Sequence, residues 1–191
     1  MDTTWHESVA QREDTVRLGV WKFLATVTML FAAFASAYIV RRSGSDWVPI
    51  GLPTVLWLNT MALLGSSLAL EAGSWMGSRR QWRRASAVLG SAFALGLAFL
   101  AGQVLAWQEL MAAGVYMPAS PHSAFFYLLT GVHAVHLVGA LAFLGTVCVR
   151  TWAGLGARDA DRWRYMTGLA RTVWHFLLGI WVFVFLLLAI G

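Results

Sequence analysis

Charged residues are scarce in this chain: Asp, Glu, Lys and Arg together make up 12 % of its 191 residues, whereas 59 % are hydrophobic. A soluble domain usually carries about 25 % charged residues. The composition therefore excludes an ordinary soluble domain and places the chain in a lipid bilayer. Cysteine is almost absent too. Because Cys148 is the single cysteine, neither an internal disulfide nor a thiolate metal cluster can form.

Several recognisable patterns are also missing from the sequence. It has no linker, low-complexity segment or repeat at a fixed period, and no nucleophile or phosphate-binding motif. It also lacks the strict alternation of polar and apolar residues that is typical of a barrel strand. Since the backbone must satisfy its own hydrogen bonds in hydrocarbon, helices are the default. The connections between apolar segments are too short to hold a catalytic domain outside the membrane.

Five apolar segments are each long enough to cross about 30 Å of hydrocarbon as a helix. They cover residues 18–40, 52–72, 85–110, 124–149 and 167–190. The sequence thus predicts an all-α integral membrane bundle of five transmembrane helices. The first segment is too long for a signal-peptide core, so we expect residues 1–17 to be a retained cytoplasmic tail and residues 18–191 a single five-helix domain.

Positive charge gathers on one side of the predicted membrane. Of the 14 Lys and Arg residues, all but Arg41 and Arg42 lie in or within five residues of the N-terminal tail, the connection between the second and third segments, or the connection between the fourth and fifth segments. Because positively charged loops stay in the cytoplasm, we expect a cytoplasmic N-terminus and a periplasmic C-terminus. Anionic lipid headgroups are the expected partners of these residues, and nucleic acid is not, since no soluble domain presents the arginines.

Polar side chains within the apolar segments are the candidate functional residues. A charge at a helix centre costs about 2.5–3.5 kcal/mol, so buried ionisable groups imply pairing or function. His133 and His136 are three residues apart and share a helical face. We expect neutral histidines, hydrogen-bonded to neighbouring helices or to a partner subunit. Asn59 and Gln103 lie deep enough to hydrogen-bond across helices, a contribution of about 0.6–2 kcal/mol each.

The histidines also raise the alternative of haem or metal ligation. A bis-histidine haem needs ligands at similar depth on facing helices. At 1.5 Å per residue, His136 lies roughly 20 Å and His175 roughly 6 Å from the basic side, a mismatch of about 14 Å. Neither cysteine nor carboxylate lies in the middle of another segment to complete a metal site. We therefore expect no haem or metal in this chain.

In four of its five apolar segments the chain resembles subunit III of haem-copper terminal oxidases. Residues 123–141, SAFFYLLTGVHAVHLVGAL, look like the Phe-Phe, Thr-Gly and His-x-x-His pattern of that family. Three other stretches agree in order and spacing: WKFLATVTMLFAAFASAY at 21–38, LPTVLWLNTMALLGSSLAL at 52–70, and VWHFLLGIWVFVF at 173–185, which contains Trp174 and His175. The third segment, at 95–110, is compatible but looser. The resemblance covers nearly the whole chain after residue 17.

The resemblance implies the five-helix form of a non-catalytic subunit in a bacterial inner membrane. Such a subunit packs on catalytic subunit I, holds phospholipid in a cleft between helices, and supports proton uptake and stable turnover. Haem and copper are then expected in partner subunits and not in this chain. The family-motif residues here, for which helix packing is the expected role, are Asn59, Gln103, His133, His136, Trp174 and His175.

The chain also departs from the family pattern. Where family members often carry a membrane carboxylate, it has Val27, Ala106 and Leu178, so we expect no direct proton-conducting role. One alternative within the family is an accessory subunit of a nitric oxide reductase. Another, of a different class, is a small haem-binding cytochrome that exchanges electrons with quinol. Whether the complex oxidises cytochrome c or quinol depends on a site in other chains.

Overall fold

The computed structural model describes residues 3–190, with side chains from residue 14 onward, and within that range it consists of helices without a strand. The long helices are α1 (Thr3–Arg41), α2 (Val55–Ser78), α3 (Trp82–Ala112), α4 (Pro121–Trp152) and α6 (Ala160–Ile190); the short ones are η1 (Met117–Ala119) and α5 (Leu155–Arg158). Five of them are long and apolar enough to cross a membrane. The predicted all-α membrane bundle is thereby confirmed.

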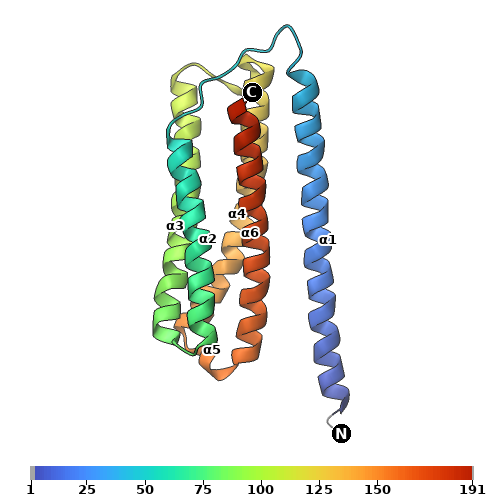
Figure 1. The fold of residues 1–191 in the computed structure, drawn as a ribbon, viewed down its shortest axis with the longest axis vertical. Coiled ribbons are helices and arrows are strands. Elements are labelled where there is room, and N and C mark those ends of the chain that lie inside the picture. Colours follow the sequence, from blue (N-terminus) through green and yellow to red (C-terminus); the bar gives the residue numbers. More distant parts are fainter. Residues whose placement is uncertain (1–2, 191) are drawn as a thin grey trace.

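Successive long helices run in opposite directions (Figure 1). The N-terminus, the α2–α3 turn and α5 lie at one end of the bundle, and the C-terminus and the α1–α2 connection lie at the other. Helices α2, α3, α4 and α6 pack closely, whereas α1 stands to one side and contacts α4 and α6. This peripheral position of α1 leaves room for grooves along its inner face.

The ends of the helices differ from the expected ones, and at the start of α4 a capping residue accounts for the difference. Helix α4 begins at Pro121 and not at residue 124. Ser120 caps it: its hydroxyl accepts a hydrogen bond from the Ser123 backbone N–H at 3.1 Å, while the Ser123 hydroxyl accepts one from the Ser120 N–H at 3.0 Å. This reciprocal capping box, with proline in the first turn, starts the helix within a segment whose composition resembles a loop.

Helix α1 begins at Thr3, so most of the segment predicted as a tail is helical. Met1 and Asp2 lie outside the described residues, as do the side chains of residues 3–13. The cytoplasmic location of residues 1–17 and the 1–17/18–191 division stay predictions.

Small residues allow α2 and α3 to approach closely. The hydroxyl of Ser66 in α2 donates a hydrogen bond to the carbonyl oxygen of Ala92 in α3 at 2.7 Å. Gly73 lies against Leu89, where a methyl group would meet the leucine side chain. Close backbone approach of this kind holds helices together in lipid, where burying apolar surface gives no advantage.

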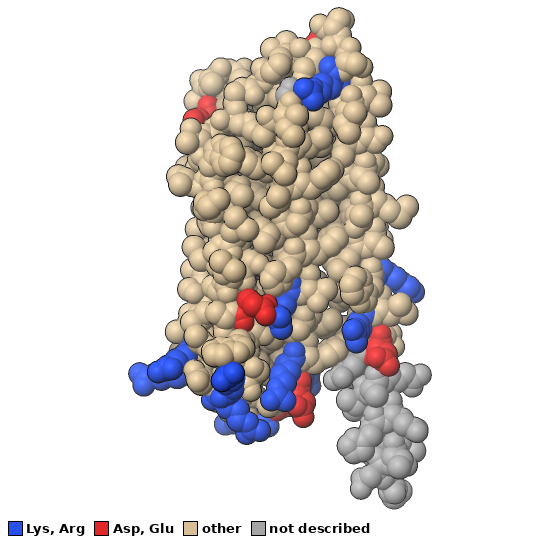
Figure 2. Space-filling view, in the orientation of Figure 1, with Lys and Arg blue, Asp and Glu red and all other residues tan. Residues whose placement is uncertain are grey.

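The two ends of the bundle differ in the number of positively charged residues they carry. Figure 2 shows Lys and Arg gathered at the end that carries α5, with few charges on the visible surface above it. The basic end carries the arginines of the α2–α3 turn and of the segment around α5, namely Arg79, Arg80, Arg83, Arg84, Arg158, Arg162 and Arg164. The opposite end carries Arg41 and Arg42. We call these two ends the basic end and the opposite end.

Candidate functional site

Among the buried polar side chains, α2, α3 and α4 each contribute one candidate residue from the sequence. We call Asn59, Gln103 and His133 the central polar layer. Their exposed fractions are 4 %, 1 % and 0 %. All three belong to the residues that the sequence singles out, and the fold brings them together from segments far apart in the chain.

A glycine positions the first member of the layer. A methyl group at Gly102 would overlap the Oδ1 atom of Asn59. The asparagine side chain of α2 can therefore lie directly against the backbone of α3, beside Gln103. A side chain at residue 102 would separate the two helices at this level.

Contacts on either side show that Gln103 faces α4. One turn before it, the Phe99 ring lies 5.9 Å from the His133 ring. One turn after it, the indole N–H of Trp107 donates a hydrogen bond to the hydroxyl of Thr130 at 3.0 Å. Residues four apart in a helix share a face, so these contacts place Gln103 on the side of α3 that faces α4, between the levels of Thr130 and His133.

Aromatic rings from three helices surround His133. Its ring centroid lies 6.4 Å from that of Phe31 in α1, 5.9 Å from that of Phe99 in α3 and 5.2 Å from that of Trp181 in α6. The indole N–H of Trp181 in turn donates a hydrogen bond to the Thr60 hydroxyl in α2 at 3.0 Å. Every membrane-crossing helix therefore contributes a side chain at or beside the central polar layer.

Five polar atoms of the layer make no hydrogen bond within the described part of the chain. They are Asn59 Nδ2, Gln103 Nε2 and Oε1, and His133 Nδ1 and Nε2. The indole nitrogen of Trp174, the other buried family-motif residue, also has no partner there. The expected interhelical hydrogen bonds of these residues stay a prediction; the structure shows that all four side chains are buried.

His136 faces a different environment from His133. Its Nδ1–H donates to the Val132 carbonyl oxygen at 2.8 Å, within its own helix. The half-buried ring lies 5.9 Å from Phe23 and 6.1 Å from Phe31 of α1. It lines an apolar groove of about 570 Å³ between α1, α4 and α6, which we call the inner groove. The groove is lined by Val16, Val20, Phe23, Val135, His136, Gly139, Ala140, Phe143, Leu169 and Val173.

A second apolar groove separates α1 from the first turns of α4. This outer groove has a volume of about 850 Å³ and lies toward the opposite end of the bundle. Its lining consists of Ala33, Ser36, Ala37, Val40, Arg41, Pro121, Ala124 and Phe125. Both grooves follow from the peripheral position of α1.

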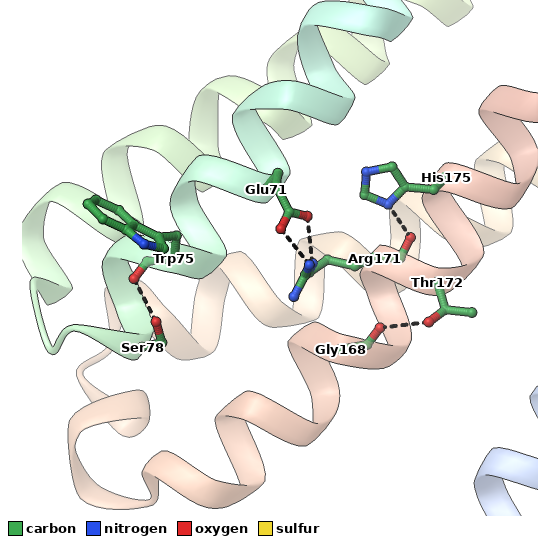
Figure 3. A network of polar contacts seen from close by, with 7 residues as sticks. All are labelled: Glu71, Trp75, Ser78, Gly168, Arg171, Thr172 and His175. Carbon is green, nitrogen blue, oxygen red and sulfur yellow. Dashed lines mark hydrogen bonds and ion pairs between the residues drawn. The ribbon is translucent and has the colours of Figure 1, made fainter.

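His175 lies beside an ion pair between α2 and α6 (Figure 3). Arg171 Nε donates to Glu71 Oε2 at 2.8 Å, and Arg171 Nη2 donates to Glu71 Oε1. The exposed His175 ring donates through Nδ1 to the Arg171 carbonyl oxygen at 2.7 Å. His175 lies one turn from Arg171 on the same face of α6, whereas the α6 residues that line the inner groove with His136 are Leu169 and Val173. The two histidines are therefore not on facing sides of α4 and α6, as a haem-ligand pair would be. Among the described residues, no three His, Cys, Asp or Glu side chains gather as a metal-binding group.

His122 is a buried residue that the sequence reasoning missed. It has an exposed fraction of 1 %. Its ring stacks on Trp47 at a centroid distance of 4.8 Å and accepts a hydrogen bond from the Ile50 backbone N–H. The available signal was the Ser-Pro sequence just before it, which marks a helix start. A helix beginning at Pro121 places His122 in its first turn, beneath the α1–α2 connection.

Comparisons with known proteins agree with this architecture. A model of the family described as cytochrome c oxidase subunit III matches residues 3–190. Cytochrome c oxidase subunit 3 of Bacillus sp. PS3 is 28 % identical over 174 residues, covering 88 % of this chain and 82 % of the relative. Subunit 3 of the cytochrome bo(3) ubiquinol oxidase of Pseudomonas aeruginosa is 30 % identical over 173 residues, covering 87 % and 80 %.

A third relative, the probable cytochrome c oxidase subunit 3 of Mycobacterium bovis, is 28 % identical over 187 residues, covering 91 % of this chain and 87 % of the relative. The family match extends over all five membrane-crossing helices. By the extent of that match, the chain belongs to the cytochrome c oxidase subunit III family.

Proposed function

We propose that this chain is the accessory subunit III of a respiratory haem-copper oxidase in a bacterial plasma membrane. The family match over residues 3–190 carries this conclusion. Haem and copper in partner subunits would reduce oxygen, and this chain would hold neither. Relatives named as cytochrome c oxidase and as ubiquinol oxidase subunits both occur. These names favour an oxidase over a nitric oxide reductase or a separate quinol-linked cytochrome.

The physical role that we propose is support of catalytic subunit I. A bundle of five apolar helices can cover the lipid-facing helices of a neighbouring membrane protein and restrict their motion. Large apolar side chains remain exposed on the lateral surface, such as Leu58, Leu68 and Val135. In a membrane they can contact lipid or a partner helix equally well.

The experiment that tests this role removes the chain from the complex. An oxidase purified from native membranes should contain this chain together with the catalytic subunit. The complex lacking it should begin turnover at a similar rate and then lose activity faster, because its catalytic subunit is less well supported. Re-addition of the full-length chain should restore the longer active lifetime. An unchanged lifetime without the chain, or its absence from the purified complex, would contradict the proposal.

We also propose that the grooves beside α1 hold phospholipid chains. Their linings are almost entirely apolar, as an acyl chain requires. The inner groove runs toward the basic end, where Arg17 and Lys22 lie between its α1 lining residues in sequence and can attract an anionic headgroup.

A bulky residue in the inner groove tests the lipid proposal. Gly139 lines the groove and has open space where a side chain would begin. Gly139→Phe should therefore fill the groove without disturbing the core, and should lower the phospholipid retained per complex, measured by mass spectrometry. Gly90→Phe is the control, because Gly90 has equally open space and lines neither groove. Equal lipid content in both variants would refute the assignment of lipid to this groove.

The charge distribution supports an orientation with the basic end in the cytoplasm. We therefore propose a cytoplasmic N-terminus and a periplasmic C-terminus. After Cys148→Ser, single cysteines at Ser45 in the α1–α2 connection and at Arg80 in the α2–α3 turn provide the test. A membrane-impermeant thiol reagent added to intact spheroplasts should label the first and not the second. The reverse labelling would show the opposite orientation.

A further inference from the structure

We propose that the central polar layer is a water-binding site inside the helix bundle, where ordered water joins the His133 imidazole to the amides of Gln103 and Asn59. This inference goes beyond the support role proposed above. It concerns the interior of the bundle and does not depend on which subunit covers its outer surface.

The first argument is the burial of the unpartnered atoms. All three side chains are at least 96 % buried, because their exposed fractions are 4 %, 1 % and 0 %. Five of their polar atoms make no hydrogen bond to any described residue, and therefore none to one another. Buried polar groups in folded proteins are almost always hydrogen-bonded, to protein or to ordered water. Here the described protein groups do not supply the partners.

The second argument is that the unpartnered atoms have complementary chemistry. A neutral imidazole has one donor and one acceptor nitrogen, the Gln103 amide has two donor hydrogens and an acceptor oxygen, and Asn59 Nδ2 has two donor hydrogens. A water molecule donates two hydrogen bonds and accepts two, and buried water typically makes about three. Water can therefore bridge an imidazole and two amides of this layer without introducing a charge.

The third argument concerns the kind of ligand. The layer contains only neutral nitrogen and oxygen groups, and no carboxylate or thiolate belongs to it. It is therefore suited to a small neutral molecule and poorly suited to an ion. One turn toward the basic end, each of the three helices that form the layer has a fully buried apolar residue, Leu63, Phe99 or Leu137, and Leu177 of α6 is buried one turn from Trp181. These residues separate the layer from water at that end, so the bound water should exchange slowly.

His122 provides an internal control in the same molecule. It is buried to nearly the same extent as His133, with exposed fractions of 1 % and 0 %. Its two ring nitrogens, however, have protein partners, the Ile50 N–H and the Tyr38 hydroxyl. If burial alone governed contact with water, the two histidines would behave alike. If unpartnered nitrogens bind water, only His133 should show it.

The experiment is solid-state NMR of the full-length chain in lipid bilayers with ¹⁵N-labelled histidine. Magnetisation transferred from water should reach the His133 ring nitrogens and be absent or several-fold weaker at those of His122. Loss of one resonance pair in His133→Phe assigns the signals. A His133 transfer no stronger than that of His122 would overturn the proposal.

A variant of a second layer residue strengthens the test. Gln103→Met keeps a long unbranched side chain but removes the amide, so the water transfer to His133 should be lost or strongly reduced. Transfer to His133 that is undiminished in this variant would show that Gln103 does not hold the water. In the wild-type chain with labelled Asn and Gln as well, direct nitrogen–nitrogen coupling between His133 and either amide would show a hydrogen bond without water and would also overturn the proposal. The wild-type measurements decide the matter even if Gln103→Met does not fold.

Discussion

The Ile50 backbone N–H donates a hydrogen bond to the Nδ1 atom of His122 at 3.1 Å, which ties the α1–α2 connection to the first turn of α4. Because Nδ1 accepts this bond, the neutral ring carries its proton on Nε2. That nitrogen lies 3.4 Å from the Tyr38 hydroxyl oxygen, near the end of α1. One imidazole thus joins three segments at the opposite end of the bundle.

The first prediction concerns this histidine. His122→Phe keeps a ring to stack on Trp47 but leaves the half-buried Ile50 N–H without its acceptor, which should destabilise the fold by about 1–3 kcal/mol. Tyr38→Phe removes only the longer of the two contacts and should cost less. Thermal unfolding of the two full-length variants in the same detergent measures the difference. Equal destabilisation by the two substitutions would show that the hydrogen bond from Ile50 contributes no more to stability than the contact with Tyr38.

The second prediction concerns Trp163 at the basic end. Its indole N–H donates to the Thr151 hydroxyl at 2.7 Å, and its ring lies where a methyl group on Gly77 would be. Gly77→Ala must displace this ring, so it should destabilise the bundle by about 1–3 kcal/mol. Gly90→Ala is the matched control. Its methyl group meets no neighbouring atom within 4 Å, and the higher helix propensity of alanine should be neutral or stabilising by up to about 1 kcal/mol. Similar unfolding temperatures for both variants would count against the packing argument.

The third prediction is a pH dependence in the α1–α2 connection. A hydrogen bond from Arg41 holds the pKa of the Asp46 carboxyl below its ordinary value of 3.8. Since the folded-state pKa is depressed, the stabilising contribution is complete above the unfolded pKa and is lost as the pH falls through the folded pKa. Carbon-13 NMR titration should therefore give a low pKa for Asp46. Arg41→Met should return the pKa toward the ordinary value, and an unaltered pKa in this variant would exclude Arg41 as the cause.

The fourth prediction concerns the absent membrane carboxylates. Val27 is buried in the core, and Ala106 and Leu178 provide no ionisable group that could form a relay with it. Val27→Glu should therefore raise neither the turnover of the complex nor the number of protons pumped per electron, and should lower its stability. Val27→Gln, which is similar in size but not ionisable, separates the effect of polarity from that of charge. A clear gain in pumping efficiency with glutamate alone would contradict this prediction.

Much of the architecture could be predicted from local patterns. The helix number and the all-α class follow from apolar segments that each span the bilayer, and the alternating direction follows from short connections. The helix ends are harder to predict; at α4, for example, the Ser120 cap begins the helix within a segment whose composition resembles a loop. The partners of His122 could not be predicted, since Tyr38 and Ile50 are 84 and 72 residues away in the sequence.

His133 and His136 show which properties of a residue could not be predicted from the sequence pattern. Their spacing places both on one face of one helix, and the sequence alone makes them equivalent members of a motif. Packing separates them: His133 lies fully buried among rings of α1, α3 and α6, whereas His136 lies at the inner groove beside α1. Membrane insertion of a segment depends on its own hydrophobicity, which can be read directly from its sequence. Burial and hydrogen bonding depend on which helices come together around a residue, and that arrangement exists only in the folded bundle.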